Sequence, residues 1–445
     1  MKDTRGSSKR EFLPLLNSGP HKQEKDRTEN MKIAGIIAEY NPFHRGHEYH
    51  LKEARKACGA DYVIAVMSGS FVQRGEPAIA DKYTRARMAL LSGADLVVEL
   101  PFAFACSAAP DFALGGVKLL DALGADCLCF GSETGDLSLL EETASRLAGE
   151  TPSQSVLVRE GMKKGLSYAD SLKLSLSESV PGADALFSGS NDILALEYCK
   201  AILKLSSGLR PVAVKRVGQE YNDLRQSSSA FMSASAVREM ILNGGLELLN
   251  DQIPPAALAV LLEALSRYTP VTSDDFSDFA WYALSPGSPL NRTGRAASDR
   301  LAQAGADPDL AMRLANNAAG SFLISELTEA ARAKNISRSS VRRAVFRLVC
   351  GLNAESMDVF RGNPEALYAR ILGFRRESAP LLSHLKQVSG LPLVAKTADA
   401  EKLLPPAARE LFNLDIGAAN LYAQAVYRKC GYRLPDEYRA GIVII

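Results

Sequence analysis

The sequence has few of the features that mark membrane, secreted or fibrous proteins. No uncharged apolar run approaches the roughly 18 residues that a membrane-spanning helix needs, and the first 30 residues lack the apolar core and cleavage site of a secretory signal. The seven cysteines form no C-x-x-C pair and leave one over, which favours reduced thiols. We therefore expect a cytoplasmic protein that has no membrane partner.

Net charge is also nearly absent. The 445 residues include 52 Lys and Arg and 51 Asp and Glu, which gives a net charge of +1. A nucleic-acid surface must then be a local patch, because the chain as a whole is not basic, and no DNA partner is indicated. The apolar fraction of 47% and the charged fraction of 23% are ordinary for a globular protein, so collagen-like, wholly disordered and coiled-coil structures are excluded.

Three copies of Gly-Ala-Asp divide the first part of the chain into repeating units. They occupy residues 59–61, 93–95 and 124–126, and each directly precedes an apolar run of strand length. Each glycine stands where a helix would end in a left-handed residue. Near-continuous apolar strands separated by helices predict a parallel sheet covered on both faces. We therefore predict an α/β domain over residues 31–240.

The remaining segments differ in composition. Residues 1–30 are mostly polar and predict a disordered N-terminal extension. Residues 241–355 are rich in Ala and Leu at helical spacing and predict a mainly helical domain. Residues 356–445 are a mixed C-terminal region that ends in a strand-like apolar run, Gly441–Ile445.

The first strand-to-helix loop, residues 39–47 (EYNPFHRGH), has the composition of a phosphate site. Pro42 stiffens it, and Gly46 allows a phosphate to approach the backbone. The start of the following helix supplies free N–H groups and the positive end of a dipole, and His44 and His47 can donate hydrogen bonds to phosphoryl oxygens. The chain contains neither a Walker A sequence nor G-x-G-x-x-G.

The histidines of this loop and helix also allow two alternatives to phosphate binding. Three of the five histidines in the chain, His44, His47 and His50, fall within seven residues. They could be ordinary surface histidines at a helix start, or they could hold a metal ion, although no carboxylate or thiol partner is obvious nearby. We favour phosphate binding and predict no metal site.

A strand followed by H-x-G-H at the start of a helix resembles the nucleotidylyltransferase superfamily with the HIGH-type motif, which is shared with class I aminoacyl-tRNA synthetases. That superfamily usually has a second, Ser/Thr-rich motif that ends in arginine. Residues 233–238 (SASAVR) fit this second motif. Two motifs in the expected order are stronger evidence than either alone.

Longer motifs narrow the resemblance to the tRNA(Met) cytidine acetate ligase family. They are residues 39–47, 66–78 (VMSGSFVQRGEPA), 81–85 (DKYTR), 99–102 (ELPF), 129–133 (CFGSE), 190–192 (SND) and 214–216 (VKR). The similarity runs from about Met31 through Arg238 and continues more loosely to the C-terminus.

This resemblance implies a fold, a reaction and partners. The fold would be a Rossmann-like parallel-sheet nucleotidylyltransferase domain followed by the helical domain and the mixed region. ATP, with Mg²⁺, would activate acetate as acetyl-adenylate, and the acetyl group would pass to the wobble cytidine of elongator tRNA(Met) to form N4-acetylcytidine. Two alternative functions stay open: a small-molecule nucleotidylyltransferase that releases pyrophosphate, and a non-catalytic RNA-binding module on the same fold.

The resemblance also implies site residues. The expected catalytic residues are His44, His47 and Arg74. The expected ATP-binding residues are Ile37, Ala38, Glu39, Tyr40, Asn41, Pro42, Phe43, His44, Arg45, Gly46, His47, Glu48, Tyr49, His50, Gly131, Asn191, Arg216, Val217, Ser235 and Arg238. From the residues alone, Gly131 could be a turn glycine, Asn191 a helix N-cap and Arg216 a surface arginine.

The RNA surface is expected on one basic stretch of the helical domain. Arg338, Arg342 and Arg343 fall on neighbouring positions of a helix with Val341 and Val345 opposing them, which indicates an amphipathic basic helix. A solvated helix face is the more common origin of such a pattern. Because the substrate implied by the resemblance is a tRNA, we predict phosphate contacts by these three arginines.

Overall fold

The computed structural model describes residues 31–149, 152–166, 168–176, 179–216, 231–285 and 296–445. Lys32–Ile445 forms one compact unit. The predicted N-terminal extension, residues 1–30, and Val217, expected to bind ATP, lie outside the described residues. Within the described ranges, no helix is long and apolar enough to cross a membrane.

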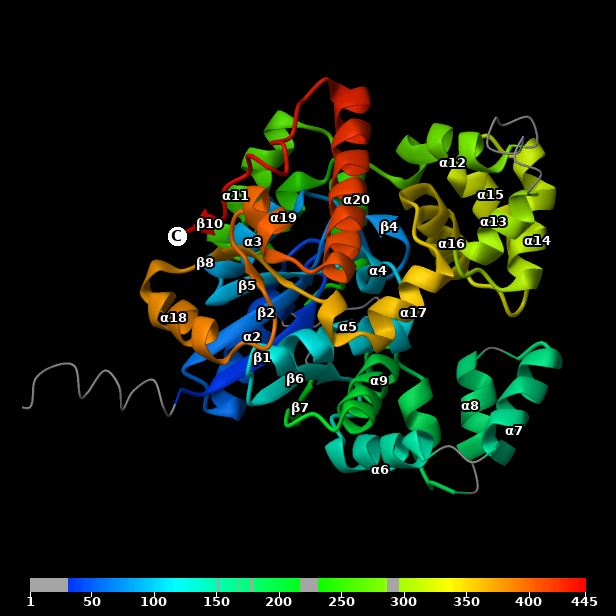
Figure 1. Ribbon diagram of the computed structural model, residues 1–445, viewed down its shortest axis with the longest axis horizontal. Helices are drawn as coiled ribbons and strands as arrows, with labels where there is room; N and C mark the ends of the chain where they lie inside the picture. The colour runs from blue at the N-terminus through cyan, green and yellow to red at the C-terminus, as the bar shows by residue number, and fades with distance from the viewer. Residues whose placement is uncertain (1–30, 150–151, 167, 177–178, 217–230, 286–295) are drawn as a thin grey trace, which may run out of the picture. The chain divides into compact units, whose positions relative to one another are not determined.

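An eight-stranded sheet lies at the centre of this unit (Figure 1). Five of its strands are parallel and follow the order β5-β2-β1-β6-β7. Their bounds are β1 Ile33–Ala38, β2 Tyr62–Ser68, β5 Leu96–Leu100, β6 Cys127–Ser132 and β7 Arg210–Lys215. The chain order reverses between β1 and β6, and open α/β sheets bind ligands at the carboxyl ends of the strands at such a switch point. The predicted Rossmann-like parallel sheet is confirmed.

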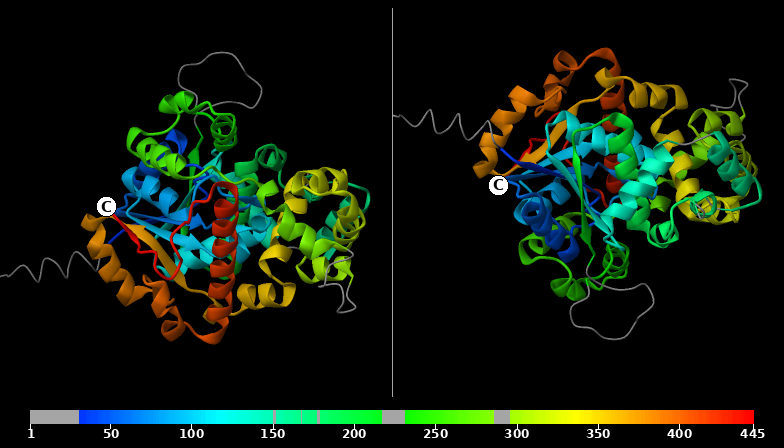
Figure 2. Two further views of the ribbon diagram at one scale, coloured as in Figure 1. Left: turned by 90° about the horizontal axis from the view of Figure 1, so that it is seen from above. Right: turned by 90° about the horizontal axis from the view of Figure 1, so that it is seen from below.

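Helices cover both faces of these strands, as the views from above and below show (Figure 2). On one face, α2 (Arg45–Cys58), α3 (Lys82–Leu91) and α11 (Pro255–Arg267) share an apolar core with β1, β2 and β5. On the opposite face lie α5 (Ala109–Ala122) and α9 (Ser190–Leu205), which also pack against each other. Helix α5 comes so close to β1 that a Cβ on Gly35 would lie 2.6 Å from the Leu120 side chain.

The Gly-Ala-Asp segments end helices and hold the starts of strands. All three glycines have positive φ, as predicted: Gly59, Gly93 and Gly124. Each aspartate accepts a hydrogen bond from a backbone N–H at the start of a neighbouring strand. The pairs are Asp61 with Lys32 at 2.9 Å, Asp95 with Val63 at 2.7 Å and Asp126 with Ile33 at 2.6 Å. The repeat therefore fixes how neighbouring strands are aligned.

Residues 241–355 are mainly helical where the structure describes them. After α10 (Ala234–Leu242) and α11 come α12 Ser277–Leu284, α13 Ala297–Gln303, α14 Pro308–Asn317, α15 Ile324–Ala331 and α16 Arg338–Cys350. The remaining α-helices of the described chain that precede this segment are α4 Phe102–Ala105, α6 Leu137–Ala148, α7 Pro152–Lys163 and α8 Tyr168–Leu176. A short antiparallel hairpin, β3 (Phe71–Val72) with β4 (Glu76–Pro77), follows β2.

The mixed C-terminal region adds strands to the same sheet. Strand β8 (Ala369–Phe374) pairs antiparallel with β5, and β9 (Leu393–Val394) and β10 (Val443–Ile444) pair parallel with β8. Its helices are α17 Ala354–Gly362, α18 Ala379–Val388, α19 Ala400–Leu403 and the 25-residue α20 Pro406–Cys430. The strand expected at the C-terminal end is confirmed, whereas the domain boundaries near residues 240 and 355 stay predictions.

One prediction about the cysteines is wrong. Cys58, at the end of α2, and Cys127, at the start of β6, form a disulfide with a Cα–Cα distance of 6.7 Å. The spacing of the cysteines in the sequence does not reveal this pair, because the two residues are 69 positions apart and become neighbours only when α2 packs beside β6. The remaining five cysteines are free thiols.

Candidate active site

The loop between β1 and α2 places two histidines at the start of a helix. His44 is the N-cap residue of α2, and its Nδ1 accepts the N–H of Gly46 at 3.0 Å. His47 returns this contact, since its Nδ1 accepts the N–H of His44 at 3.2 Å. The two rings stack with their centroids 3.7 Å apart. Because each Nδ1 is an acceptor, a neutral ring carries its proton on Nε2, which can donate to a ligand.

Burial keeps these rings neutral. Burial and the Arg216 guanidinium lower the pKa of His44 to about 3 and the pKa of His50 to about 4. Burial, the two neighbouring histidines and Arg216 hold the pKa of His47 well below its usual value. The positive end of the helix dipole and the Arg216 guanidinium both oppose protonation of the histidines. The same positive potential favours the binding of an anion at this place.

The loop that carries the histidines has an unusual backbone. Tyr40 has φ of 47°, a conformation that bulky residues rarely adopt and that is concentrated at functional sites. The next peptide bond, Asn41–Pro42, is cis. The Tyr40 ring packs edge-on against Phe43 and His47. These ring contacts fix the orientation of the His47 imidazole.

The residues expected on the far side of the switch point lie together. Arg216, directly after β7, donates through Nη1 to Asn191 Oδ1 at 3.2 Å, and its aliphatic chain lies beside Gly131 of β6. Asn191 is not the N-cap of α9, which is Gly189; its side chain instead donates to Glu133 at 2.6 Å. Arg216 also lowers the pKa of all three histidines, so its guanidinium lies within electrostatic range of the histidine loop.

The Ser-rich motif reaches the same loop through its final arginine. Ser233 caps α10 by accepting the N–H of Ala236 at 3.2 Å. Arg238 donates to the carbonyl of Asn41 at 2.8 Å and to Ser235 Oγ at 3.1 Å. The two motifs that carried the resemblance are therefore in direct contact, although Asn41 and Arg238 are 197 positions apart.

Some side chains of the expected ATP-binding set are engaged elsewhere. Arg45 donates through Nε to the carbonyl of Asp251 at 2.9 Å, so its guanidinium points out of the loop. Glu48 pairs with Lys52 one turn further along α2, at 2.9 Å. Ile37 packs against α5 on the covered face of the sheet. Contacts of these residues with ATP through their backbone atoms stay predictions.

The three arginines expected to bind RNA do not form one open helix face. Arg338 is exposed and pairs with the exposed Glu329 at 2.5 Å. Arg342 and Arg343 are half-buried. Arg342 pairs with Glu76, and Arg343 donates to a backbone carbonyl of the β3–β4 hairpin at 3.0 Å. Periodicity correctly identified a basic helix face, but it cannot show which element packs against that face.

Two carboxylates that organise the site were missed by the sequence analysis. Glu76 lies 3.6 Å from Arg238 and also pairs with Arg342. Glu133 accepts the N–H of Asn191 at 3.1 Å and so holds the start of α9. Both residues lie inside the family motifs, so their charge and their position in a motif could have identified them as site residues.

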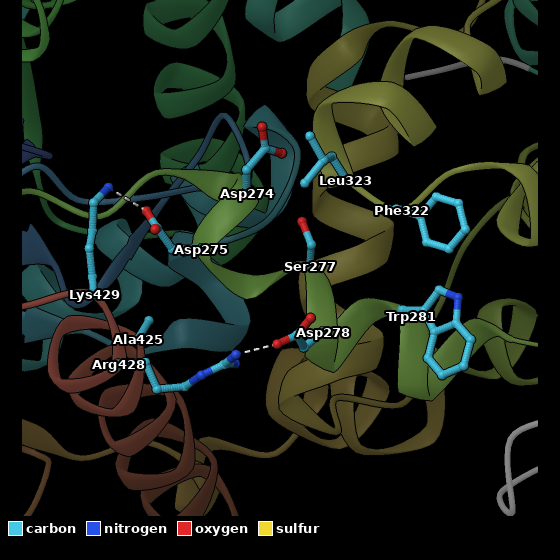
Figure 3. A pocket seen from close by; sticks show the side chains of 10 residues that line it. All are labelled: Asp274, Asp275, Ser277, Asp278, Trp281, Phe322, Leu323, Ala425, Arg428 and Lys429. Carbon is cyan, nitrogen blue, oxygen red and sulfur yellow. Dashed lines mark hydrogen bonds and ion pairs between the residues drawn. The ribbon is translucent and has the colours of Figure 1, made fainter.

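A pocket elsewhere in the described chain has different chemistry. Its volume is about 650 Å³, and it is lined by residues of α12, of α20 and of the segments directly before α12 and α15. In Figure 3, Asp275 faces Lys429 and Asp278 faces Arg428, and both are ion pairs. The two basic groups that line this pocket are already paired with carboxylates, so it is a poorer phosphate site than the β1–α2 loop.

The sheet order and the site define a class of protein. A parallel sheet with a switch point, a histidine pair at the start of the first helix and a Ser-rich motif whose arginine holds the histidine loop together define a nucleotidyl transferase with the HIGH motif. In agreement, residues 31–435 match the HIGH Nucleotidyl Transferase family.

Individual relatives identify the particular family. The tRNA(Met) cytidine acetate ligase of Acetivibrio thermocellus is 34% identical over 426 residues, covering 93% of this chain and 100% of the relative. That of Caldanaerobacter subterraneus subsp. tengcongensis is 37% identical over 402 residues, covering 89% and 96%. The crystal structure of Thermotoga maritima TmcAL bound with alpha-thio ATP has a TM-score of 0.82 and 31% identity, covering 93% and 100%. The chain belongs to the tRNA(Met) cytidine acetate ligase family, so the predicted family is confirmed.

Proposed function

We propose that this chain activates acetate with ATP and transfers the acetyl group to the wobble cytidine of elongator tRNA(Met), forming N4-acetylcytidine in the cytoplasm. The observation that carries the proposal is the pair of Nε2–H donors on His44 and His47 at the start of α2, with Arg216 near enough to lower the pKa of both rings. The positive end of the α2 dipole, two neutral donors and a guanidinium together favour a polyphosphate. The relative crystallised with alpha-thio ATP supports the same ligand.

The first step depends on positioning more than on a protein base. Acetate is ionised at neutral pH, so its oxygen can attack the α-phosphorus directly. The bond from that phosphorus to the bridging oxygen breaks, and pyrophosphate leaves with the electron pair. His44 and His47 donate to the phosphoryl oxygens as negative charge builds, and the guanidinium groups of Arg74 and Arg216 neutralise that charge.

The second step is acyl transfer to the tRNA. The exocyclic amine of cytidine attacks the acetyl carbonyl, the carbon–oxygen bond to AMP breaks, and the amine releases one proton. The wobble base must leave the anticodon stack to reach the adenylate. Of the arginines predicted to contact RNA, Arg338 has an exposed side chain, and we propose it as a phosphate contact.

Mg²⁺, expected with ATP, would arrive on the nucleotide phosphates. Glu133 and Asp192, at this end of β6, are both engaged, because each accepts two or more hydrogen bonds from neighbouring backbone N–H groups. In the part of the chain that the structure describes, no group of three or more His, Cys, Asp or Glu side chains is arranged to hold a metal ion. These residues do not fit a protein-held Mg²⁺, and no step above depends on one.

The test is incubation of the protein with ATP, labelled acetate and bulk tRNA, followed by nucleoside analysis. We expect labelled N4-acetylcytidine that depends on both ATP and acetate and is confined to elongator tRNA(Met). A product on different tRNAs would contradict the proposed substrate. Pyrophosphate release without any labelled nucleoside would instead favour a small-molecule nucleotidylyltransferase.

A further inference from the structure

The tip of the β3–β4 hairpin is fixed from two sides. The backbone N–H of Gln73 donates to Glu39 Oε1 at 2.9 Å, in the loop that follows β1. The carbonyl of the same residue accepts from Arg343 Nη1 at 3.0 Å, on α16. One residue of the tip is therefore held between the histidine loop and a helix of the region 241–355.

Gly75 lets the tip lie directly on the backbone of α16. Its φ is +67°, and a Cβ there would lie 2.4 Å from the backbone nitrogen of Arg343 and 2.8 Å from the carbonyl carbon of Arg342. A side chain at this position would need a strained backbone and would collide with atoms that cannot move aside. The hairpin and α16 are thus fitted to each other.

Glu76 extends this contact to the Ser-rich motif. Its carboxylate pairs with Arg342 and lies 3.6 Å from Arg238 Nη2, and the three side chains are only 16–21% exposed. Arg238 in turn donates to the carbonyl of Asn41 in the histidine loop. Partly buried ion pairs are screened less by solvent than surface pairs are. A continuous set of contacts therefore runs from α16 through Glu76 to the loop that carries the histidines.

Arg74 lies at the hairpin tip that these contacts hold in place. It lies at the tip between Gln73 and Gly75, and its side chain is exposed. Among the residues that the structure describes, it has no hydrogen-bond or ion-pair partner. Its neighbour Gln73 is bonded to Glu39, and the charge of Arg74 lowers the pKa of both Glu39 and Arg238, so the residue lies beside the histidine loop. A cation held there without a partner is available to an anionic ligand.

We propose that Arg342 and Arg343 are positioning residues for the adenylation step, which hold the hairpin against the histidine loop so that Arg74 reaches the phosphates or the acetate. The inference rests on the proposed function and extends it. It gives the helical region a part in forming acetyl-adenylate that is separate from any contact with tRNA.

The experiment is acetate-dependent exchange of labelled pyrophosphate into ATP, measured without tRNA. We expect Arg342→Ala and Arg343→Ala to lower kcat about 10- to 100-fold, because a small misplacement of a catalytic group has effects of that size. KM for ATP should change less. Arg342→Lys should recover part of the rate, because an ammonium group can still pair with Glu76. Arg313→Ala is the matched control: this arginine on α14, whose side chain is 43% exposed, pairs with Asp309, and its loss should leave the rate unchanged.

A double variant separates positioning from general stabilisation. If α16 acts through Arg74, Arg74→Ala/Arg342→Ala should be no slower than Arg74→Ala alone. Multiplied losses in the double variant would overturn the proposal. So would full exchange activity of Arg342→Ala and Arg343→Ala with weakened tRNA binding, because the two arginines would then serve RNA instead.

Failure of the proposed function has a different signature. A wild-type protein without exchange activity would contradict acetate activation itself. Amide hydrogen–deuterium exchange at Gln73 would then still test whether α16 holds the hairpin against the histidine loop, since that N–H is bonded to Glu39. Faster amide hydrogen exchange at Gln73 in Arg342→Ala than in Arg313→Ala supports the positioning role, and equal rates overturn it.

Discussion

At the residue scale, the histidine pair divides its two ring nitrogens between different tasks. Nδ1 of His44 and Nδ1 of His47 each accept a backbone N–H and so cap the first turn of α2. Nε2 of each ring keeps the proton, because burial makes the rings neutral. The helix start and the ligand site therefore depend on the same side chains but on different atoms.

This division predicts that stability and activity separate in suitable variants. In His44→Asn, the amide oxygen can take the place of Nδ1 and keep the cap, but nothing replaces the Nε2–H donor. We expect an unchanged midpoint of thermal unfolding and a loss of pyrophosphate exchange of about 100-fold or more, as when an oxyanion donor is removed. His44→Ala should also lose about 1 kcal/mol of stability with the cap. Full exchange activity of His44→Asn would exclude the proposed donor role.

The low pKa of His50 predicts a pH dependence of folding. Its pKa is about 4 in the folded chain, against the usual 6.5, so between these values the unfolded chain binds more protons. The stability due to the neutral ring is complete above pH 6.5 and is lost as the pH falls. At pH 5 the loss from this one group is at most roughly 2 kcal/mol. Urea denaturation at pH 7.5 and pH 5 should show a smaller loss in His50→Gln than in wild type; identical losses would contradict the neutral ring.

At the element scale, the Gly-Ala-Asp repeat joins helix ends to strand starts. The three aspartates have the same sequence context but differ in burial. Asp95 is buried and binds the N–H of Val63, the Ser378 hydroxyl and the Arg55 guanidinium. Asp61 is exposed and binds the N–H of Lys32. We therefore expect the aspartates of the repeat to contribute differently to the free energy of unfolding.

We predict that Asp95→Ala lowers the free energy of unfolding by about 1–3 kcal/mol or more, because it leaves a buried N–H and a guanidinium without their acceptor. Asp61→Ala is the matched control, and its effect should stay within about 0.5 kcal/mol, as for most exposed positions. Chemical denaturation of both variants measures the difference. Equal effects would mean that the strand-start hydrogen bond alone sets the contribution and that burial adds nothing.

The repeat also shows what the sequence can and cannot predict. Helix ends and strands follow from local patterns, so the glycines, the parallel sheet and the histidine loop were predictable. The partners of Arg45 and of the two arginines on α16 were not, because those contacts join residues 206 to 270 positions apart. A basic helix face has the same periodicity whether it meets solvent, RNA or a hairpin.

At the scale of the whole molecule, a buried ion cluster joins the C-terminal region to α3 and β5 of the parallel sheet. Lys82 lies 2.9 Å from both Glu99 and Glu437, and Arg370 lies 2.6 Å from Glu437. Their side chains are at most 10% exposed. Arg370 belongs to β8, the strand that the C-terminal region adds beside β5. Composition could not reveal this association, because the charges are balanced only when all four residues come together.

This cluster predicts a large and specific cost for losing one of its cations. Arg370→Met keeps most of the side-chain volume but leaves Glu99 and Glu437 with Lys82 as their shared cation. Removing one partner of a buried ion group costs about 3–5 kcal/mol, because the remaining charges stay desolvated. Arg375→Ala, which loses only a partly exposed pair with Glu377, should cost less than about 1 kcal/mol. If denaturation shows equal costs, the strand pairing of β8 with β5 holds the C-terminal region in place without help from the charges.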